Sequence, residues 1–197
     1  MAPPGKVEIT APETERMLNV ALVYQDTLSL KWATQVCDQL AQRVGKESVR
    51  RTWWEISRLS DPGMLEDAVL SAMQADVIIV SVYDAEELPF ALCVWISIWL
   101  SRRTPSAGAL VALISLPEQP DSQTFRAQNY LRAVARTARM DFLLRERMRT
   151  VTSHGFVYVE KNADKTNATT QLLQEVLSQN QNTDWGIDEP RGATKAA

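Results

Sequence analysis

Polar side chains that could bind or transform a ligand follow four short apolar runs of the chain. In chain order they are Tyr24, Gln25, Asp26 and Thr27, then Ser57 and Arg58, then Ser81, Tyr83, Asp84, Glu86 and Glu87, and last Ser115 and Glu118. If the apolar runs are parallel strands, these groups meet at the carboxyl edge of one sheet, where such sheets bind ligands. One hypothesis is therefore a small-ligand site, formed by Asp26, Thr27, Ser81, Asp84 and Glu87.

Other kinds of active site lack the residues they need. The chain contains one histidine, His154, which excludes a metal site built on several histidines. Cys37 and Cys93 fall within apolar helical patterns, where a thiol usually packs as a small hydrophobic group. No G-x-G-x-x-G segment and no Walker loop is present to hold a phosphate. We therefore predict no catalytic residues, no metal and no cofactor, and we favour a function other than catalysis.

The composition indicates a soluble globular protein of ordinary size. The 197 residues are 45% hydrophobic and 23% charged, and the formal net charge is −3. This charge produces no field that would attract nucleic acid or an anionic membrane, so we predict neither as a partner. The opening segment "MAPPGKVEITAPETERM" lacks the charged head and apolar run of a secretion signal. With only two cysteines, the chain is expected to be cytoplasmic.

Strand-like and helix-like patterns alternate along the chain with short turns between them. This alternation predicts an α/β domain with a mostly parallel sheet and helices on both faces. We expect a flavodoxin-like three-layer sandwich of five strands in the order 2-1-3-4-5. Strands are expected at 18–24, 48–56, 76–83 and 108–116, with the fifth at either 140–144 or 155–160, and helices at 28–45, 60–74, 88–103, 122–139 and 167–180.

The ends of the chain are expected to lie outside the sandwich. Residues 1–16 are rich in proline, glutamate and threonine, which predicts a flexible arm before a single domain at 17–180. The tail at 181–197 contains "DWGIDEP", and we expect it to dock on the domain through Trp185.

The predicted helix at 88–103 is apolar almost all the way round. On a helical wheel one stripe should pack on the sheet, and it contains Leu92, Trp95, Ile96 and Trp99. An opposite flank carries Phe90, Val94 and Ile98 where a surface helix would carry charge. We predict that this helix forms an interface with a protein partner or in a homodimer, with Trp95 and Trp99 as nearby anchors. The alternative is that the N-terminal arm or the tail covers the flank.

The alternation of strands and helices resembles a response-regulator receiver domain over roughly residues 18–145, and the segment "ADVIIVS" aligns with the third strand of receivers. That resemblance places Ser81 at the position of the phospho-acceptor aspartate, while Asp26 matches only one of the two carboxylates that hold magnesium. Lys161 is the sole match for the receiver lysine. The resemblance therefore implies a regulatory module without phosphotransfer.

The longer segment "AMQADVIIVSVYDAEELPFALCVWISIWL" resembles the TIR and nucleoside deoxyribosyltransferase group. Those enzymes use a glutamate inside the helix, but no acidic residue occurs from Pro89 to Leu100, so glycosidic chemistry is not expected. The motifs "DVIIVSVYDAEELP…W…WL" and "WGIDE" are similar to those of a bacterial family with no established activity.

Flavodoxins hold the flavin phosphate in a loop after the first strand that is rich in serine, threonine and glycine. The corresponding segment "YQDTLSLK" offers Thr27 and Ser29 but no glycine, so FMN is not expected.

Two functions remain. The first is a non-enzymatic, receiver-like regulatory or interaction domain that associates through the helix at 88–103. The alternative is a protein that binds a nucleotide or flavin, or a hydrolase, with its site at the carboxyl ends of the strands.

Overall fold

The computed structural model describes residues 17–83, 88–104, 106–116, 124–152 and 155–162. Several predictions from the sequence fall elsewhere and lie outside the described residues. They concern the arm at 1–16, the tail with Trp185, the helix at 167–180, His154, and the acidic residues Asp84, Glu86, Glu87 and Glu118.

A six-stranded sheet with the order β2-β1-β3-β4-β5-β6 forms the centre of the protein. The strands are β1 Leu18–Tyr24, β2 Val49–Glu55, β3 Val77–Tyr83, β4 Ala109–Leu116, β5 Asp141–Thr152 and β6 Gly155–Asn162. The first five run parallel, which confirms the predicted order 2-1-3-4-5. The two candidates for the fifth strand, 140–144 and 155–160, both correspond to strands: the first to β5 and the second to β6, which pairs antiparallel with β5.

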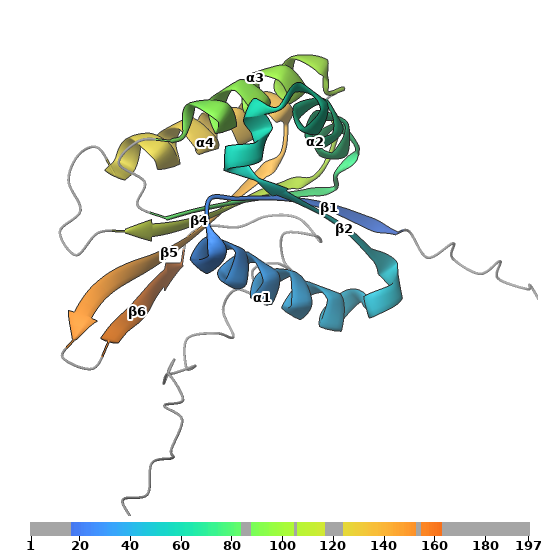
Figure 1. Ribbon diagram of the computed structural model, residues 1–197. Coiled ribbons are helices and arrows are strands. Elements are labelled where there is room, and N and C mark those ends of the chain that lie inside the picture. The colour runs from blue at the N-terminus through green and yellow to red at the C-terminus, as the bar shows by residue number, and fades with distance from the viewer. Residues whose placement is uncertain (1–16, 84–87, 105, 117–123, 153–154, 163–197) are drawn as a thin grey trace, which may run out of the picture.

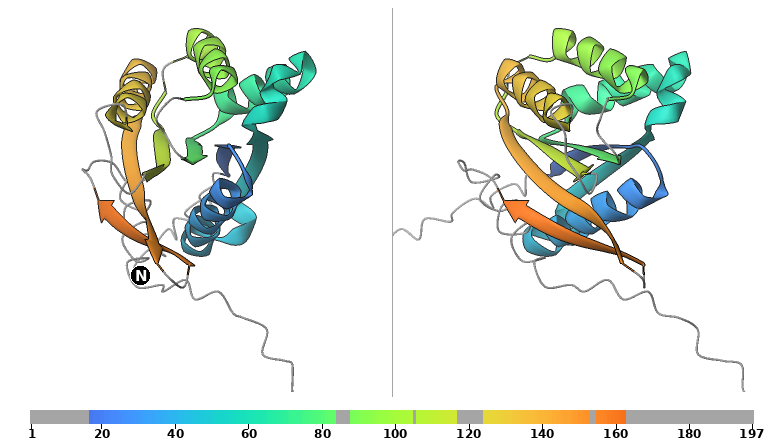
Figure 2. Two further views of the ribbon diagram at one scale, coloured as in Figure 1. Left: turned by 60° about the vertical axis from the view of Figure 1, so that its left-hand side comes forward. Right: turned by 90° about the vertical axis from the view of Figure 1, so that its left-hand side faces the viewer.

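Helices cover both faces of the sheet, as Figures 1 and 2 show. On one face lies α1 (Thr27–Val44), and on the other lie α2 (Pro62–Gln74), α3 (Phe90–Arg102) and α4 (Thr124–Ala138). Two short 3-10 turns, η1 (Lys46–Ser48) and η2 (Ile56–Ser60), flank β2. The central strand β4 is buried along its whole length because apolar layers enclose both of its faces.

The position of α3 explains why its sequence is apolar on nearly every side. Its inner stripe, predicted from the helical wheel, is fully buried against the sheet: Leu92, Trp95, Ile96 and Trp99. Helices α2 and α4 lie on either side of α3 in the same layer (Figure 2). As a result Ile98, predicted to need a partner, is half-buried against the protein's own core. Phe90, at the start of the helix, remains 84% exposed.

The loops at the amino edge of the sheet are joined by short hydrogen bonds. Asp76 occupies the centre: its backbone N–H donates to the Asn19 carbonyl at 2.8 Å, and its own carbonyl accepts the Ala109 N–H at 2.9 Å. The Asp76 carboxylate also accepts the Asn19 N–H at 2.9 Å. The Gly108 carbonyl accepts the N–H of Asp141 at 2.9 Å. These contacts hold the amino ends of β1, β3, β4 and β5 together.

Candidate functional site

The carboxyl ends of β1 and β3 lie side by side, with Tyr24 opposite Ser81 in the parallel register. After β1 the chain passes to α1 on one face, whereas α3, the helix that follows β3, lies on the other face (Figure 1). This divergence of the connections is a topological switch point, the position at which open parallel sheets bind ligands. The candidate site is therefore the carboxyl edge between β1 and β3.

The turn from β1 into α1 is closed by a reciprocal pair of side chains. The Asp26 carboxylate is the N-cap of α1 and accepts the Ser29 N–H at 2.8 Å. In return the Ser29 hydroxyl oxygen accepts the Asp26 N–H at 2.8 Å and the Gln25 N–H at 3.0 Å. This capping box satisfies the N–H groups of Asp26 and Ser29 from within the turn. Asp26 thus has a local structural role at the site.

Ser81 fastens the first turn of α1 to β3. Its side chain is fully buried, and its hydroxyl donates to the Ser29 carbonyl oxygen at 2.9 Å. Its backbone carbonyl accepts the Gln25 N–H at 3.1 Å. The Ser81 hydroxyl is therefore buried and hydrogen-bonded inside the protein. A phospho-acceptor at this position would have to be exposed to solvent. Sequence reasoning placed Ser81 at the correct strand end, but only its surroundings show that its contacts are internal.

Thr27 and Tyr24 are both accessible to solvent at this edge, although Tyr24 also packs against the core on the α1 face. Thr27 is exposed at the first position of α1, and Tyr24 is half-buried at the end of β1. After β2, the exposed Ser57 hydroxyl donates to the Glu55 carboxylate at 2.6 Å. Of the five residues predicted to bind ligand, the structure thus brings Asp26, Thr27 and Ser81 together, while the other two lie outside the described residues.

Two buried arginines near the same edge were missed by the sequence analysis. Arg145 and Arg147 alternate along β5 with Leu144 and Glu146, which face the side of α4, so the two arginines point to the face that carries α1. Arg145 is 0% exposed, and Arg147 is 8% exposed with its guanidinium 4.1 Å from the centre of the Trp32 ring. The signal was the two-residue spacing in "RER", which was hidden because this segment could be read as either helix or strand.

The β5–β6 ribbon extends past the carboxyl edge. Pairing between β4 and β5 ends at Leu116 opposite Met148, whereas β5 continues to Thr152 and remains paired with β6. Four further residues at about 3.3 Å each extend the ribbon by roughly 13 Å. The backbone of this ribbon therefore projects beyond the candidate site at one end of the sheet, as Figure 1 shows.

The cysteines are poor nucleophiles in this fold. Burial of Cys37 raises the pKa of its thiol to about 12, with the nearby Arg51 opposing the shift. Burial also raises the pKa of Cys93, with a hydrogen bond from Tyr130 opposing it. Because the thiolate is the reactive form, neither thiol is activated near neutral pH. Among the described residues, no group of three or more histidine, cysteine or acidic side chains could hold a metal ion.

No protein-family model matches the sequence, and no curated protein matches it. Among solved structures, a short-chain flavodoxin associated with a non-canonical PDU bacterial microcompartment has a TM-score of 0.51 at 16% identity. That match covers 83% of this chain and 98% of the flavodoxin. An oxidoreductase from Corynebacterium diphtheriae has a TM-score of 0.53 at 12% identity, again covering 83% of this chain and 98% of the other. The fold is flavodoxin-like.

Flavodoxins hold the FMN phosphate in the turn after their first strand, and in this protein the corresponding segment is the turn after β1. A phosphate needs free backbone N–H groups at a helix N-terminus and space for close approach. Here the turn "YQDTLS" contains no glycine, and the Asp26 carboxylate occupies the N-cap. The turn therefore does not fit the phosphate group.

Within the described ranges, no helix combines the length and apolar character that a membrane crossing requires.

Proposed function

We propose that this protein binds a small heteroaromatic ligand of the flavin or nucleoside class at the carboxyl edge between β1 and β3. The observation that carries the proposal is the switch point itself, where the β1–α1 turn and the end of β3 meet. The half-buried Tyr24 ring at that edge offers a surface for stacking, and the exposed Thr27 hydroxyl offers a hydrogen bond. The flavodoxin among the structural matches supports the same ligand class.

The proposal is tested by thermal unfolding with riboflavin and with adenosine as probes. A ligand present at about 100 times its Kd stabilises a protein by about 2.7 kcal/mol, which raises Tm measurably. We expect one probe to raise the Tm of the full chain, and we expect the variant Thr27→Trp to abolish that rise because the indole fills the edge.

Thr104→Trp is the matched control, since Thr104 is also exposed but lies between α3 and β4 at the amino edge. This variant should keep the full shift in Tm. Equal losses in both variants would place the ligand elsewhere on the protein, and no shift with either probe in the unmodified chain would contradict the proposed ligand class.

A second candidate function is self-association through the outer surface of α3. The specific observation is Phe90, a large apolar side chain with 84% of its surface exposed. Val94 follows it on the same outer side and is half-buried, whereas Trp95 and Trp99 are fully buried and lie out of reach of a partner. We propose that a second copy of the chain covers Phe90 and Val94.

Sedimentation measures this second candidate directly. We expect the full chain to sediment as a dimer and Phe90→Asp to sediment as a monomer, because a charge at the centre of an apolar contact lacks a partner. Leu70→Asp is the control, since Leu70 is an exposed apolar residue of α2. A monomeric unmodified chain would rule out self-association.

A further inference from the structure

We propose that Asp26 is a specificity-determining residue that selects ligands without a phosphate group. This inference rests on the proposed function, and it names the ligand class more narrowly. Riboflavin or a nucleoside would fit the edge, whereas FMN or a nucleotide with its phosphate at the β1–α1 turn would be rejected. The inference follows from three features of the turn. Several of its N–H groups already have acceptors, the Asp26 carboxylate carries a negative charge, and hydrogen bonds hold the turn in place.

Several backbone N–H groups of the turn are engaged within the turn itself. The N–H groups of Gln25 and Asp26 donate to the Ser29 hydroxyl, and that of Ser29 donates to the Asp26 carboxylate. The Leu30 N–H donates to the Asp26 carbonyl at 2.9 Å in the first helical hydrogen bond. A phosphate would have to displace the carboxylate from the Ser29 N–H before it could bind there.

The charge of Asp26 adds to this competition. The positive end of the helix dipole attracts one anion, and the Asp26 carboxylate already occupies that position as the N-cap. A phosphate brought to the same turn would therefore meet a negative charge at short range. An uncharged ring or ribityl chain would meet no such repulsion, and the carboxylate could accept a hydrogen bond from its hydroxyl groups.

The turn is also held from the opposite side, so that the carboxylate cannot easily swing away. The Ser29 hydroxyl donates to the Asp26 carbonyl at 2.9 Å, and the buried Ser81 hydroxyl donates to the Ser29 carbonyl at 2.9 Å. Rearranging the turn would break these bonds at a buried position, which is costly. The first contact closes the turn, and the second anchors it to β3.

Fluorescence titration of the full chain with riboflavin and with FMN tests the inference. We expect riboflavin to bind at least about 10-fold more tightly than FMN, as expected for a short-range repulsion of this kind. The variant Asp26→Asn keeps a good N-cap acceptor and removes the charge. It should tighten FMN binding by about 10-fold while riboflavin binding changes by less than about 3-fold.

Asp61→Asn provides the matched control. Asp61 is the N-cap of α2, and its carboxylate accepts the Met64 N–H at 2.9 Å, so the same substitution removes an equivalent charge at another helix. We expect this variant to leave the ratio of riboflavin to FMN affinity unchanged. Asp26→Ser, a second neutral N-cap, should reproduce the effect of Asp26→Asn.

The possible results separate the two proposals. Tighter binding of FMN than of riboflavin by the unmodified chain, or an unchanged ratio in both Asp26 variants, would overturn the role of Asp26 while leaving the ligand site in place. If neither flavin nor adenosine binds the unmodified chain or the variants, the proposed function itself is wrong, and the inference fails with it.

Discussion

Replacing Arg103 with methionine is expected to lower the free energy of unfolding by about 3 kcal/mol, because buried hydrogen bonds to a charged group are lost. Arg103 follows α3 and is only 7% exposed. Its guanidinium donates to the carbonyls of Ala72 at 2.6 Å and Ala75 at 2.9 Å, and to the Ser106 hydroxyl at 3.1 Å. It thereby binds the carbonyl end of α2, where positive charge is also favoured by the helix dipole.

The expected loss is smaller than the sum of these bonds because Arg103 is costly to bury. Burial lowers the pKa of its guanidinium, and the nearby Asp76 carboxylate opposes that shift. Methionine has no charge to desolvate, but it leaves the carbonyls of Ala72 and Ala75 without their donor. For a domain of this size, about 3 kcal/mol corresponds to a fall in Tm of roughly 6–12 °C. Denaturant unfolding with an unchanged m-value measures the effect.

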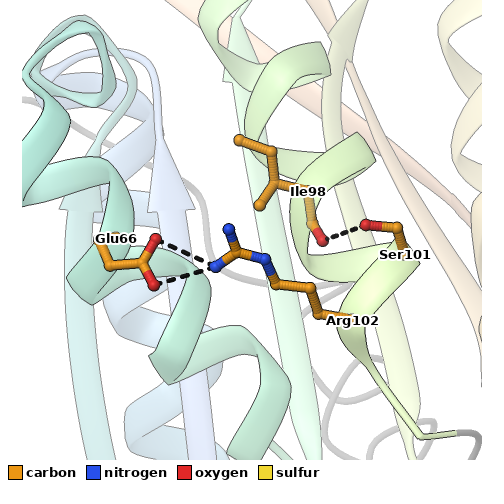
Figure 3. Close-up of polar contacts among 4 residues, drawn as sticks. All are labelled: Glu66, Ile98, Ser101 and Arg102. Atoms are coloured by element: carbon orange, nitrogen blue, oxygen red, sulfur yellow. Dashed lines mark hydrogen bonds and ion pairs between the residues drawn. The ribbon is translucent and has the colours of Figure 1, made fainter.

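Arg102→Met is the control at the adjacent position. Arg102 is exposed and forms an ion pair with Glu66 of α2, with Nη1 and Oε1 2.9 Å apart (Figure 3). Exposed ion pairs contribute about 0–1 kcal/mol to stability, so the free energy of unfolding of this variant should be close to that of the unmodified protein. If the two variants lose similar amounts of stability, the buried network around Arg103 is not what secures α2 to α3.

Gly108→Ala should destabilise the protein by about 3 kcal/mol, the upper end of the range for overpacking. A Cβ atom at Gly108 would lie 2.7 Å from the Asp76 carbonyl oxygen and 3.3 Å from Cε of Met140. The first contact is with backbone, and that carbonyl already accepts the Ala109 N–H. The edge must therefore move apart, which breaks the hydrogen bonds that begin β4 and β5.

Gly63→Ala is the corresponding control in α2. A Cβ atom there would lie 3.3 Å from the Asp61 carboxylate, and alanine has the higher helix propensity, by about 1 kcal/mol. We expect a change in unfolding free energy within about 1 kcal/mol in either direction. A Gly108→Ala variant as stable as Gly63→Ala would show that the amino edge adapts, contrary to the close contact at Asp76.

Arg103→Met and Gly108→Ala both change the amino edge of the sheet, far from the proposed ligand site. They should therefore lower stability without changing ligand affinity. In the folded fraction of Arg103→Met or Gly108→Ala, ligand affinity should match that of the unmodified chain, because the β1–α1 turn and Ser81 lie at the opposite edge. The site and the stabilising network thus occupy opposite ends of the same strands.

The sequence alone predicted the order of the parallel strands and the presence of helices on both faces of the sheet. Apolar runs on both faces of β3 and β4 require cover from both sides, and right-handed connections then leave few topologies. The same reasoning identified the inner stripe of α3, because helical spacing places Trp95 and Trp99 toward the sheet. It also located Asp26, Thr27 and Ser81 at one edge.

Only the tertiary structure decided what those residues contact. The apolar flank of α3 predicted a partner, but neighbouring helices bury Ile98, and a periodicity within one segment carries no information about helices brought beside it by the fold. Likewise, the spacing of Asp26 and Ser29 is compatible with either ligand binding or capping. Their reciprocal hydrogen bonds, together with the bond from Ser81 on a strand 52 residues away, determine that the turn is closed, because such contacts depend on distances in space.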